Sequence, residues 1–173
     1  MLLAVIAAAV LVVDRVSKIL VVEHLDLGVA VPVLGELLQL RYVENPGAAF
    51  SLGGGTTWVF AIIAAAVVVV ILVFARRIRS LAWASVFGLL LGGTVGNLVD
   101  RLIRPPSFGQ GHVVDFLQIW GFPAIFNLAD VAIVAAMVLF VILTLRGVGL
   151  DGRRRASTDA TRAAPADPTI ESR

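Results

Sequence analysis

Two aspartates lie at the edge of one of the most apolar regions of the chain. Asp115 follows a pair of valines, and Asp130 directly precedes an uncharged run over residues 131–145. A carboxylate at the centre of a membrane helix costs roughly 2.5 to 3.5 kcal/mol on insertion scales, so such a residue generally faces a polar site inside a helix bundle. Asp130 therefore needs a partner, and Asp115 is the candidate. A pair of carboxylates near a membrane surface indicates acid–base chemistry.

The depth of Asp130 depends on where its helix begins. If a helix over residues 121–145 starts near residue 122, Asp130 lies about 12 Å inside it, at a rise of about 1.5 Å per residue. Asn127 is three residues before Asp130 and shares its helix face. Asp115 precedes this helix and could fold back over its mouth, but a solvated loop aspartate explains Asp115 equally well.

The composition indicates a polytopic membrane protein. Of the 173 residues, 59% are hydrophobic and 15% are charged, whereas a soluble domain is roughly half apolar and a quarter charged. The chain has no cysteine, which excludes disulfides, thiol nucleophiles and cysteine-ligated metals. His24 and His112 lie far apart and form no His-Glu-x-x-His zinc motif, so we expect no metal site.

Four apolar segments are long enough to cross the hydrocarbon, which takes about 20 residues. They cover residues 2–22, 56–75, 80–99 and 121–145. Arginines cluster in residues 76–79 and 146–155, and the positive-inside rule predicts that both stretches are cytoplasmic. Four spans then place both termini in the cytoplasm and the polar motifs near the extracytoplasmic face. Topology explains the arginines, and with no basic face that carries interleaved aromatics we expect no nucleic-acid partner.

The connection between the first two spans has β character. Residues 38–42 alternate apolar and polar side chains, and residues 29–34 could pair with them. We therefore expect a mainly α membrane fold of four transmembrane helices, with a small extracytoplasmic β-sheet at about residues 23–55, between helices one and two. A plain connector explains this segment equally well. Residues 1–146 form the four-helix membrane domain of this prediction, and residues 147–173, poor in apolar side chains, form a disordered cytoplasmic tail.

Other polar residues could support the two aspartates. Asp14 and Lys18 are four residues apart on the first helix and can pair, which a structural ion pair would explain. Asn45 precedes a proline-glycine turn that ordinary turn chemistry accounts for.

The third helix adds two further donors. Asn97 and Arg101 share one of its faces and suit peptide carbonyls or lipid phosphate, although Arg101 could merely reach the head groups. Asp100 could neutralise Arg101. Gly88, Gly92 and Gly96 on the same helix recur at a spacing that lets another helix backbone approach closely.

Five motifs in this order resemble those of the bacterial lipoprotein signal peptidases (signal peptidase II), over about residues 10–145. They are Asp14-x-x-x-Lys18, Asn45-x-Gly47-Ala48-Ala49-Phe50, Gly92-Gly93-x-x-Gly96-Asn97-x-x-Asp100-Arg101, Val113-Val114-Asp115-Phe116 and Phe126-Asn127-x-Ala129-Asp130. One departure is the link over residues 102–112, which looks longer than is usual in that family.

The resemblance implies an intramembrane aspartic endopeptidase of the bacterial cytoplasmic (inner) membrane. Such an enzyme removes the signal peptide from diacylglyceryl-modified prolipoproteins by cutting before the lipidated cysteine, and it requires no metal or organic cofactor. The family's catalytic pair corresponds to Asp115 and Asp130. The substrate-binding or site-supporting residues correspond to Asn45, Gly47, Asn97, Arg101 and Asn127, and a site-stabilising pair to Asp14 and Lys18.

The alternative from another class is a small transporter or proton relay that uses the intramembrane Asp, Lys and Arg residues. A conduit needs polar groups along its whole length, whereas the polar groups of this chain gather at one end of the predicted bundle.

Overall fold

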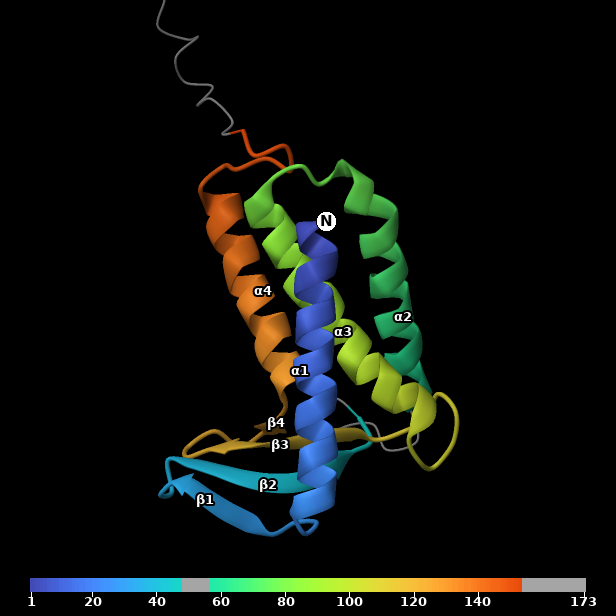
Figure 1. Cartoon of the computed structure of the whole chain (residues 1–173), viewed down its shortest axis with the longest axis vertical. Coiled ribbons are helices and arrows are strands. Elements are labelled where there is room, and N and C mark those ends of the chain that lie inside the picture. Colours follow the sequence, from blue (N-terminus) through green and yellow to red (C-terminus); the bar gives the residue numbers. More distant parts are fainter. Residues whose placement is uncertain (48–56, 154–173) are drawn as a thin grey trace, which may run out of the picture.

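The computed structural model of the chain describes residues 1–47 and 57–153. Within these residues the helices stand side by side and a small sheet lies across one end of them (Figure 1). The helices are α1 (Leu2–His24), α2 (Thr57–Phe74), α3 (Leu81–Ile103) and α4 (Leu128–Leu145), with a short 3₁₀ turn, η2 (Ala75–Arg77), after α2. The strands are β1 (Ala30–Leu34), β2 (Leu38–Asn45), β3 (Val113–Ile119) and β4 (Ile125–Phe126).

The helices carry the composition of membrane spans. In the described part of the chain, three of them are long and apolar enough to cross a bilayer: α2 with η2, α3 and α4. The apolar side chains of α2 face outward, as Val69, Val70 and Val73 are each more than half exposed. The chain is thus a membrane-type helical protein with a small antiparallel sheet.

Helix α3 lies at the centre of the bundle and packs against α1, α2 and α4. Its glycines allow this close approach, as their spacing predicts. A Cβ on Gly92 would lie 2.7 Å from the carbonyl oxygen of Ala7 on α1, and a Cβ on Gly93 would lie 2.5 Å from that of Ala129 on α4. The small residues therefore set the distance from α3 to two neighbouring helices.

The sheet is antiparallel in the order β1-β2-β3-β4. The predicted pairing of residues 29–34 with residues 38–42 is present as β1 and β2. The expectation of a sheet built only between helices one and two was incomplete, because β3 and β4 come from between α3 and α4. Val113 to Phe116 are buried on both faces of β3, so this strand has no polar–apolar alternation to reveal it.

Strand β3 pairs with β2 so that Asp115 lies opposite Val43, and Val113 lies opposite Asn45. The C-terminal end of β2 therefore reaches the start of β3. This register brings the side chain of Asn45 to that of Asp115.

Helix α4 begins at Leu128, seven residues later than the predicted start at residue 121. Asn127 is the N-cap, and with Asp130 it forms a capping box: the Asn127 side chain accepts from the Asp130 backbone N–H, and the Asp130 side chain accepts from the Asn127 backbone N–H. Asp130 thus lies in the first turn, and the predicted depth of about 12 Å was wrong. The predicted third span ends at residue 99, whereas α3 continues to Ile103.

The first prediction concerns the contact between α1 and α3. Gly92→Ala should lower the free energy of unfolding in detergent by about 1–3 kcal/mol, because the new methyl overlaps the Ala7 carbonyl. A Gly→Ala change in an unconstrained helix would stabilise by about 1 kcal/mol. Ala82→Val, on the exposed side of α3, is the control and should change little. A stabilised Gly92→Ala variant would contradict this packing.

Candidate active site

The two aspartates singled out from the sequence line one cavity of about 670 Å³. Asp115 comes from β3 and Asp130 from the first turn of α4. Asp115 is 2% exposed, so the interpretation of a solvated loop residue was wrong. Asn45, Asn97 and Arg101 line the same cavity.

Each of the four carboxylate oxygens accepts one hydrogen bond. Asp115 accepts from the Nδ2 atoms of Asn127 at 2.6 Å and of Asn45 at 2.8 Å. Asp130 accepts from the Nδ2 atom of Asn97 at 2.8 Å and from the Asn127 backbone N–H at 3.1 Å. Asn127 therefore bridges the two carboxylates, and each oxygen keeps a lone pair that can face the cavity.

Further contacts fix the orientation of the side-chain amides. The Oδ1 atom of Asn97 accepts from Lys18 at 2.9 Å and from Asn127 at 3.1 Å, so its Nδ2 must face Asp130. The Oδ1 atom of Asn45 accepts from the backbone N–H of Gly47 at 3.0 Å, which turns its Nδ2 toward Asp115. The cavity thus presents amide donors to both carboxylates.

Lys18 is completely buried and connects this network to α1. Its ammonium lies 2.9 Å from a carboxylate oxygen of Asp14, 2.9 Å from one of Asp100 and 2.9 Å from Oδ1 of Asn97. The ammonium thus lies between two carboxylates and donates a hydrogen bond to the amide oxygen of Asn97. The expected Asp14–Lys18 pairing is present, and Asp14 also accepts from the backbone N–H of Ala129, beside Asp130.

Asp100 does not neutralise Arg101, contrary to one interpretation of the sequence. It is fully buried and binds Lys18, Arg15 and Arg104, the last at 2.9 Å. Its second oxygen accepts from the backbone N–H of Val114 at 3.4 Å. Asp100 thus ties α1 and α3 to the strand that carries Asp115. The i, i+4 spacing of Asp100 and Arg104 would have revealed this pair if the full length of α3 had been predicted.

Arg101 reaches across the mouth of the cavity. Its guanidinium donates to the carbonyl oxygens of Asn97 and Gly47, each at 3.3 Å. It also lies over the ring of Phe60, 5.9 Å from the centroid. Its Nε is buried and has no partner among the described residues.

The environment of Asp115 favours its protonated form. Burial raises the pKa of Asp115 to about 7, and the hydrogen bond from Asn45 opposes this shift, while the neighbouring charge of Asp130 adds to it. The carboxyl of Asp115 is therefore suited to hold a proton near neutral pH.

The opposite wall of the cavity is apolar and includes Ile119, Phe122, Val131 and Val134. The cavity is thus lined by polar side chains on one part of its surface and by apolar side chains on another. Within residues 1–47 and 57–153, no three His, Asp or Glu side chains gather so as to hold a metal ion.

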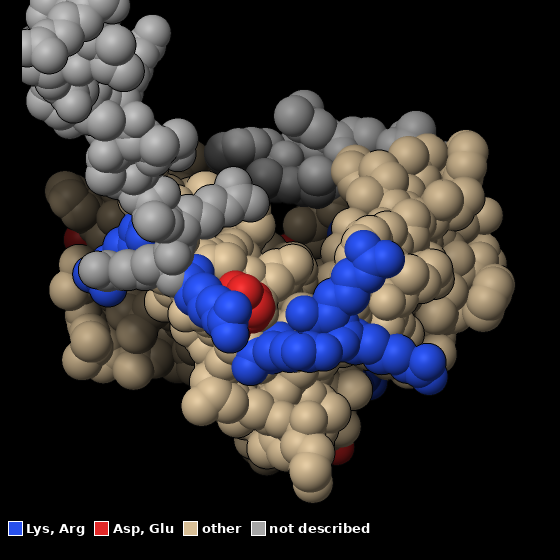
Figure 2. Space-filling model, turned by 90° about the horizontal axis from the view of Figure 1, so that it is seen from above, with Lys and Arg blue, Asp and Glu red and all other residues tan. Residues whose placement is uncertain are grey.

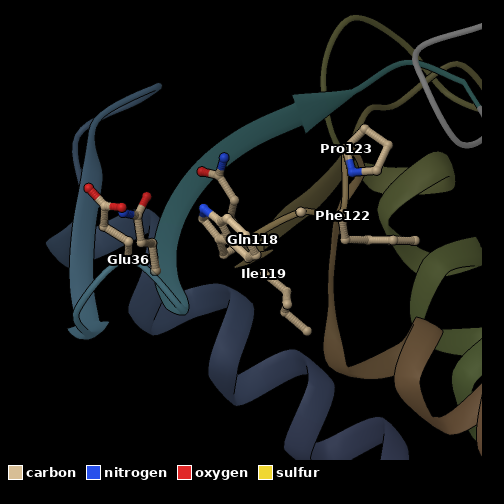
Figure 3. A pocket seen from close by; sticks show the side chains of 8 residues that line it. Glu36, Gln118, Ile119, Phe122 and Pro123 are labelled. Atoms are coloured by element: carbon tan, nitrogen blue, oxygen red, sulfur yellow. The ribbon is translucent and has the colours of Figure 1, made fainter.

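A second hollow, of about 340 Å³, lies on the sheet and shares Ile119 and Phe122 with the first (Figure 3). Glu36 from the β1–β2 turn and Gln118 from β3 face it. Its described lining contains one carboxylate, that of Glu36, so it lacks the pair that acid–base chemistry needs.

Known proteins are similar in sequence to this chain over most of its length. A family model described as signal peptidase (SPase) II matches residues 6–146. The chain belongs to the signal peptidase II family. A lipoprotein signal peptidase of Leifsonia xyli subsp. xyli is 58% identical over 159 residues, which cover 92% of this chain and 74% of the relative. One from Rhodococcus jostii is 46% identical over 155 residues, covering 90% and 78%. The resemblance recognised in the motifs is confirmed.

Solved structures share the fold of this signal peptidase II family member. Two structures described as bacterial membrane enzymes have TM-scores of 0.74 and 0.71, at 25% and 28% sequence identity. The first covers 88% of this chain and 93% of its own, and the second covers 82% and 91%. The likeness therefore includes the helices together with the sheet.

The second prediction concerns the buried ammonium. Lys18→Met should lower the free energy of unfolding by about 3–5 kcal/mol, because it leaves the buried Asp14 without its counter-charge and removes one of the three cations around Asp100. Adding Asp14→Asn should recover part of this loss by removing one uncompensated charge. Glu23→Gln, an exposed change on α1, is the control for unfolding in detergent. Equal stability of Lys18→Met and Glu23→Gln would disprove the role of the network.

The third prediction concerns pH. The pKa of Asp115 is about 7 in the folded state against 3.8 for the unperturbed group, so the folded protein binds this proton more tightly than the unfolded chain does. The contribution of Asp115 to stability is therefore complete below pH 3.8 and declines up to about pH 7. Asp115→Asn should flatten the pH dependence of unfolding in that window, and the exposed Asp26→Asn should not. An unchanged slope in Asp115→Asn would refute the raised pKa.

Proposed function

We propose that this chain is an intramembrane aspartic endopeptidase that removes the signal peptide from prolipoproteins. The observation that carries the proposal is the cavity in which Asp115 and Asp130, from two different elements, are bridged by Asn127. Membership of the signal peptidase II family supports the same activity.

The chemistry follows from the shared proton. The ionised carboxylate of the pair takes a proton from a water molecule as the water oxygen attacks the scissile carbonyl carbon, and the protonated carboxyl donates to the carbonyl oxygen, which gives a tetrahedral diol. The C–N bond then breaks as the carboxyl that gained the proton passes it to the leaving nitrogen. The amides of Asn45, Asn97 and Asn127 hold the two carboxylates in place during this exchange. Arg101 lines the cavity and is placed to bind a substrate carbonyl. No step requires a metal or an organic cofactor.

The proposal includes four membrane spans. Helix α1 has 23 residues and carries the charged residues Asp14, Arg15 and Lys18. Asp14 and Lys18 are fully buried against α3 and do not contact lipid, whereas Val12, Val13 and Val16 are exposed. A helix of this length whose charges face inward can cross the bilayer.

The orientation of the bundle follows from its arginines. Arg76, Arg77, Arg79 and Arg146 lie at the end opposite the sheet (Figure 1). The positive-inside rule makes that end cytoplasmic, together with both termini and the tail that follows residue 146. The sheet and the active site then lie at the extracytoplasmic face of the bacterial cytoplasmic membrane, where water can reach the dyad.

The substrate class follows from the two walls of the cavity. Its polar floor suits the peptide bond, and its apolar wall on α4 suits a lipid-linked segment that remains in contact with the bilayer. A diacylglyceryl-modified cysteine has this combination, so the acyl chains would fix the register of a cut just before the cysteine. Membrane lipid is then a second partner of the site.

A transporter or proton relay is a weaker proposal. The buried charged residues of the described chain are Asp14, Lys18, Asp100 and Asp115. They lie at the sheet end of the helices, and the described bundle interior toward the other end holds only apolar or uncharged side chains. Such a bundle offers no continuous polar path for an ion.

The fourth prediction is cleavage of a lipidated prolipoprotein by the purified protein in detergent. Asp115→Asn and Asp130→Asn should each lower turnover by at least about 10²-fold, because each removes one partner in proton transfer. Asp26→Asn, in the loop before β1, is the matched control and should retain turnover. Both site variants should remain folded. Near-normal turnover by either would refute the dyad.

A further inference from the structure

The end of the bundle opposite the sheet carries a group of arginines that the peptidase chemistry does not use. Arg76 and Arg77 lie in η2, Arg79 precedes α3, Arg146 caps α4, and Arg153 lies seven residues further on. We call these five residues the arginine cluster. Figure 2 views this end directly and shows Lys and Arg side chains gathered across it, with little acidic surface among them.

Residues 147–153, which the sequence predicts to begin a disordered tail, are instead ordered and fold back onto the start of α3, whereas residues 154–173 of that tail lie outside the described residues. The carbonyl oxygen of Leu150 accepts from the backbone N–H groups of Arg79 at 3.1 Å and Ser80 at 3.0 Å. The indole of Trp83 donates to the carbonyl oxygen of Val148 at 2.9 Å. The turn closes where the Gly149 N–H donates to the carbonyl oxygen of Arg153 at 2.8 Å. The segment after α4 is thereby fastened to the start of α3.

The five guanidinium groups are exposed and have no ion-pair partner among the described residues. Asp151 accepts the backbone N–H of Arg153, and it is the single acid between the end of α4 and Arg153. Charges of one sign held together repel each other unless anions bind between them. The fastened turn therefore concentrates exposed positive charge that favours an anionic partner.

The neighbouring side chains identify that partner as part of the bilayer. Leu81 and Leu145, at the ends of α3 and α4, are 72% and 82% exposed. Arg77 lies over the ring of Phe74, 5.1 Å from its centroid, and so stays close to an apolar surface. A soluble acidic partner would leave these apolar side chains in water, whereas a phospholipid covers them with its chains and meets the arginines with its phosphate.

We propose that the arginine cluster binds the phosphate groups of anionic phospholipids in the leaflet at this end of the bundle. The proposal is independent of the peptidase activity, because it uses no residue of the dyad or its supporting network. Each basic residue near an anionic membrane surface contributes about a fivefold gain in affinity. The interaction should weaken at high salt, because exposed charges are screened.

The experiment uses the full chain in nanodiscs of phosphatidylcholine alone or with phosphatidylglycerol. The thermal unfolding midpoint should rise with phosphatidylglycerol, and native mass spectrometry should detect retained phosphatidylglycerol. The triple variant Arg76→Gln, Arg79→Gln, Arg153→Gln should lose the shift and bind roughly 100-fold more weakly, which is about fivefold for each of the three charges. These side chains are exposed, so the variant should still fold in phosphatidylcholine.

The matched control is the triple change to Lys at the same positions, which keeps the charge and should keep most of the shift. High salt should abolish the difference between the two lipid mixtures for the unmodified chain. An equal phosphatidylglycerol effect in the Gln and Lys variants would overturn the proposal. So would the absence of any phosphatidylglycerol effect in the unmodified chain, since the arginines would then act only on orientation during insertion.

Discussion

The structure depends on one buried ammonium. Lys18 lies inside an apolar bundle with no exposure, and such a charge is tolerated only where its desolvation is offset by well-placed acceptors. Its three acceptors come from α1 and α3: Asp14, Asp100 and the amide of Asn97. The requirement to satisfy this one group fixes the rotation of α1 about its axis relative to α3.

The need to satisfy Lys18 also affects the positions of Asp115 and Asp130, by two routes. Through Asn97, Lys18 determines which amide atom faces Asp130. Through Asp100, it helps to hold β3, because the Asp100 oxygen that contacts Lys18 also accepts from the backbone N–H of Val114, next to Asp115. Gly96 makes the arrangement possible, since a Cβ there would lie 2.5 Å from the Asp14 carboxylate. The glycines of α3 and the charges of α1 are thus parts of one constraint.

The sequence predicted those features that have a regular period or an extreme composition. The apolar helices have an extreme composition, whereas the β1–β2 alternation and the glycine spacing are periodic. The motifs identified the family, and they predicted Asp115 and Asp130, which the structure brings to one cavity. The missed features are non-local. The run Val113-Val114-Asp115-Phe116 is buried on both faces, so its pairing with β2 leaves no alternation. The start of α4 was misplaced because Phe122 to Phe126 are as apolar as the helix, and the capping box at Asn127 decides the boundary.

The role of Asp100 illustrates a further limit. From the sequence, its neighbour Arg101 is the obvious partner, but adjacent helix residues point in different directions. Asp100 faces α1, and Arg101 faces the cavity. Because these two side chains point in different directions from α3, Asp100 is a counter-ion of the buried ammonium and Arg101 is a cation in the cavity.

The position of the cavity follows from the elements that carry the two aspartates. Asp115 belongs to the sheet and Asp130 to the first turn of a helix, so their cavity forms where the sheet meets the bundle.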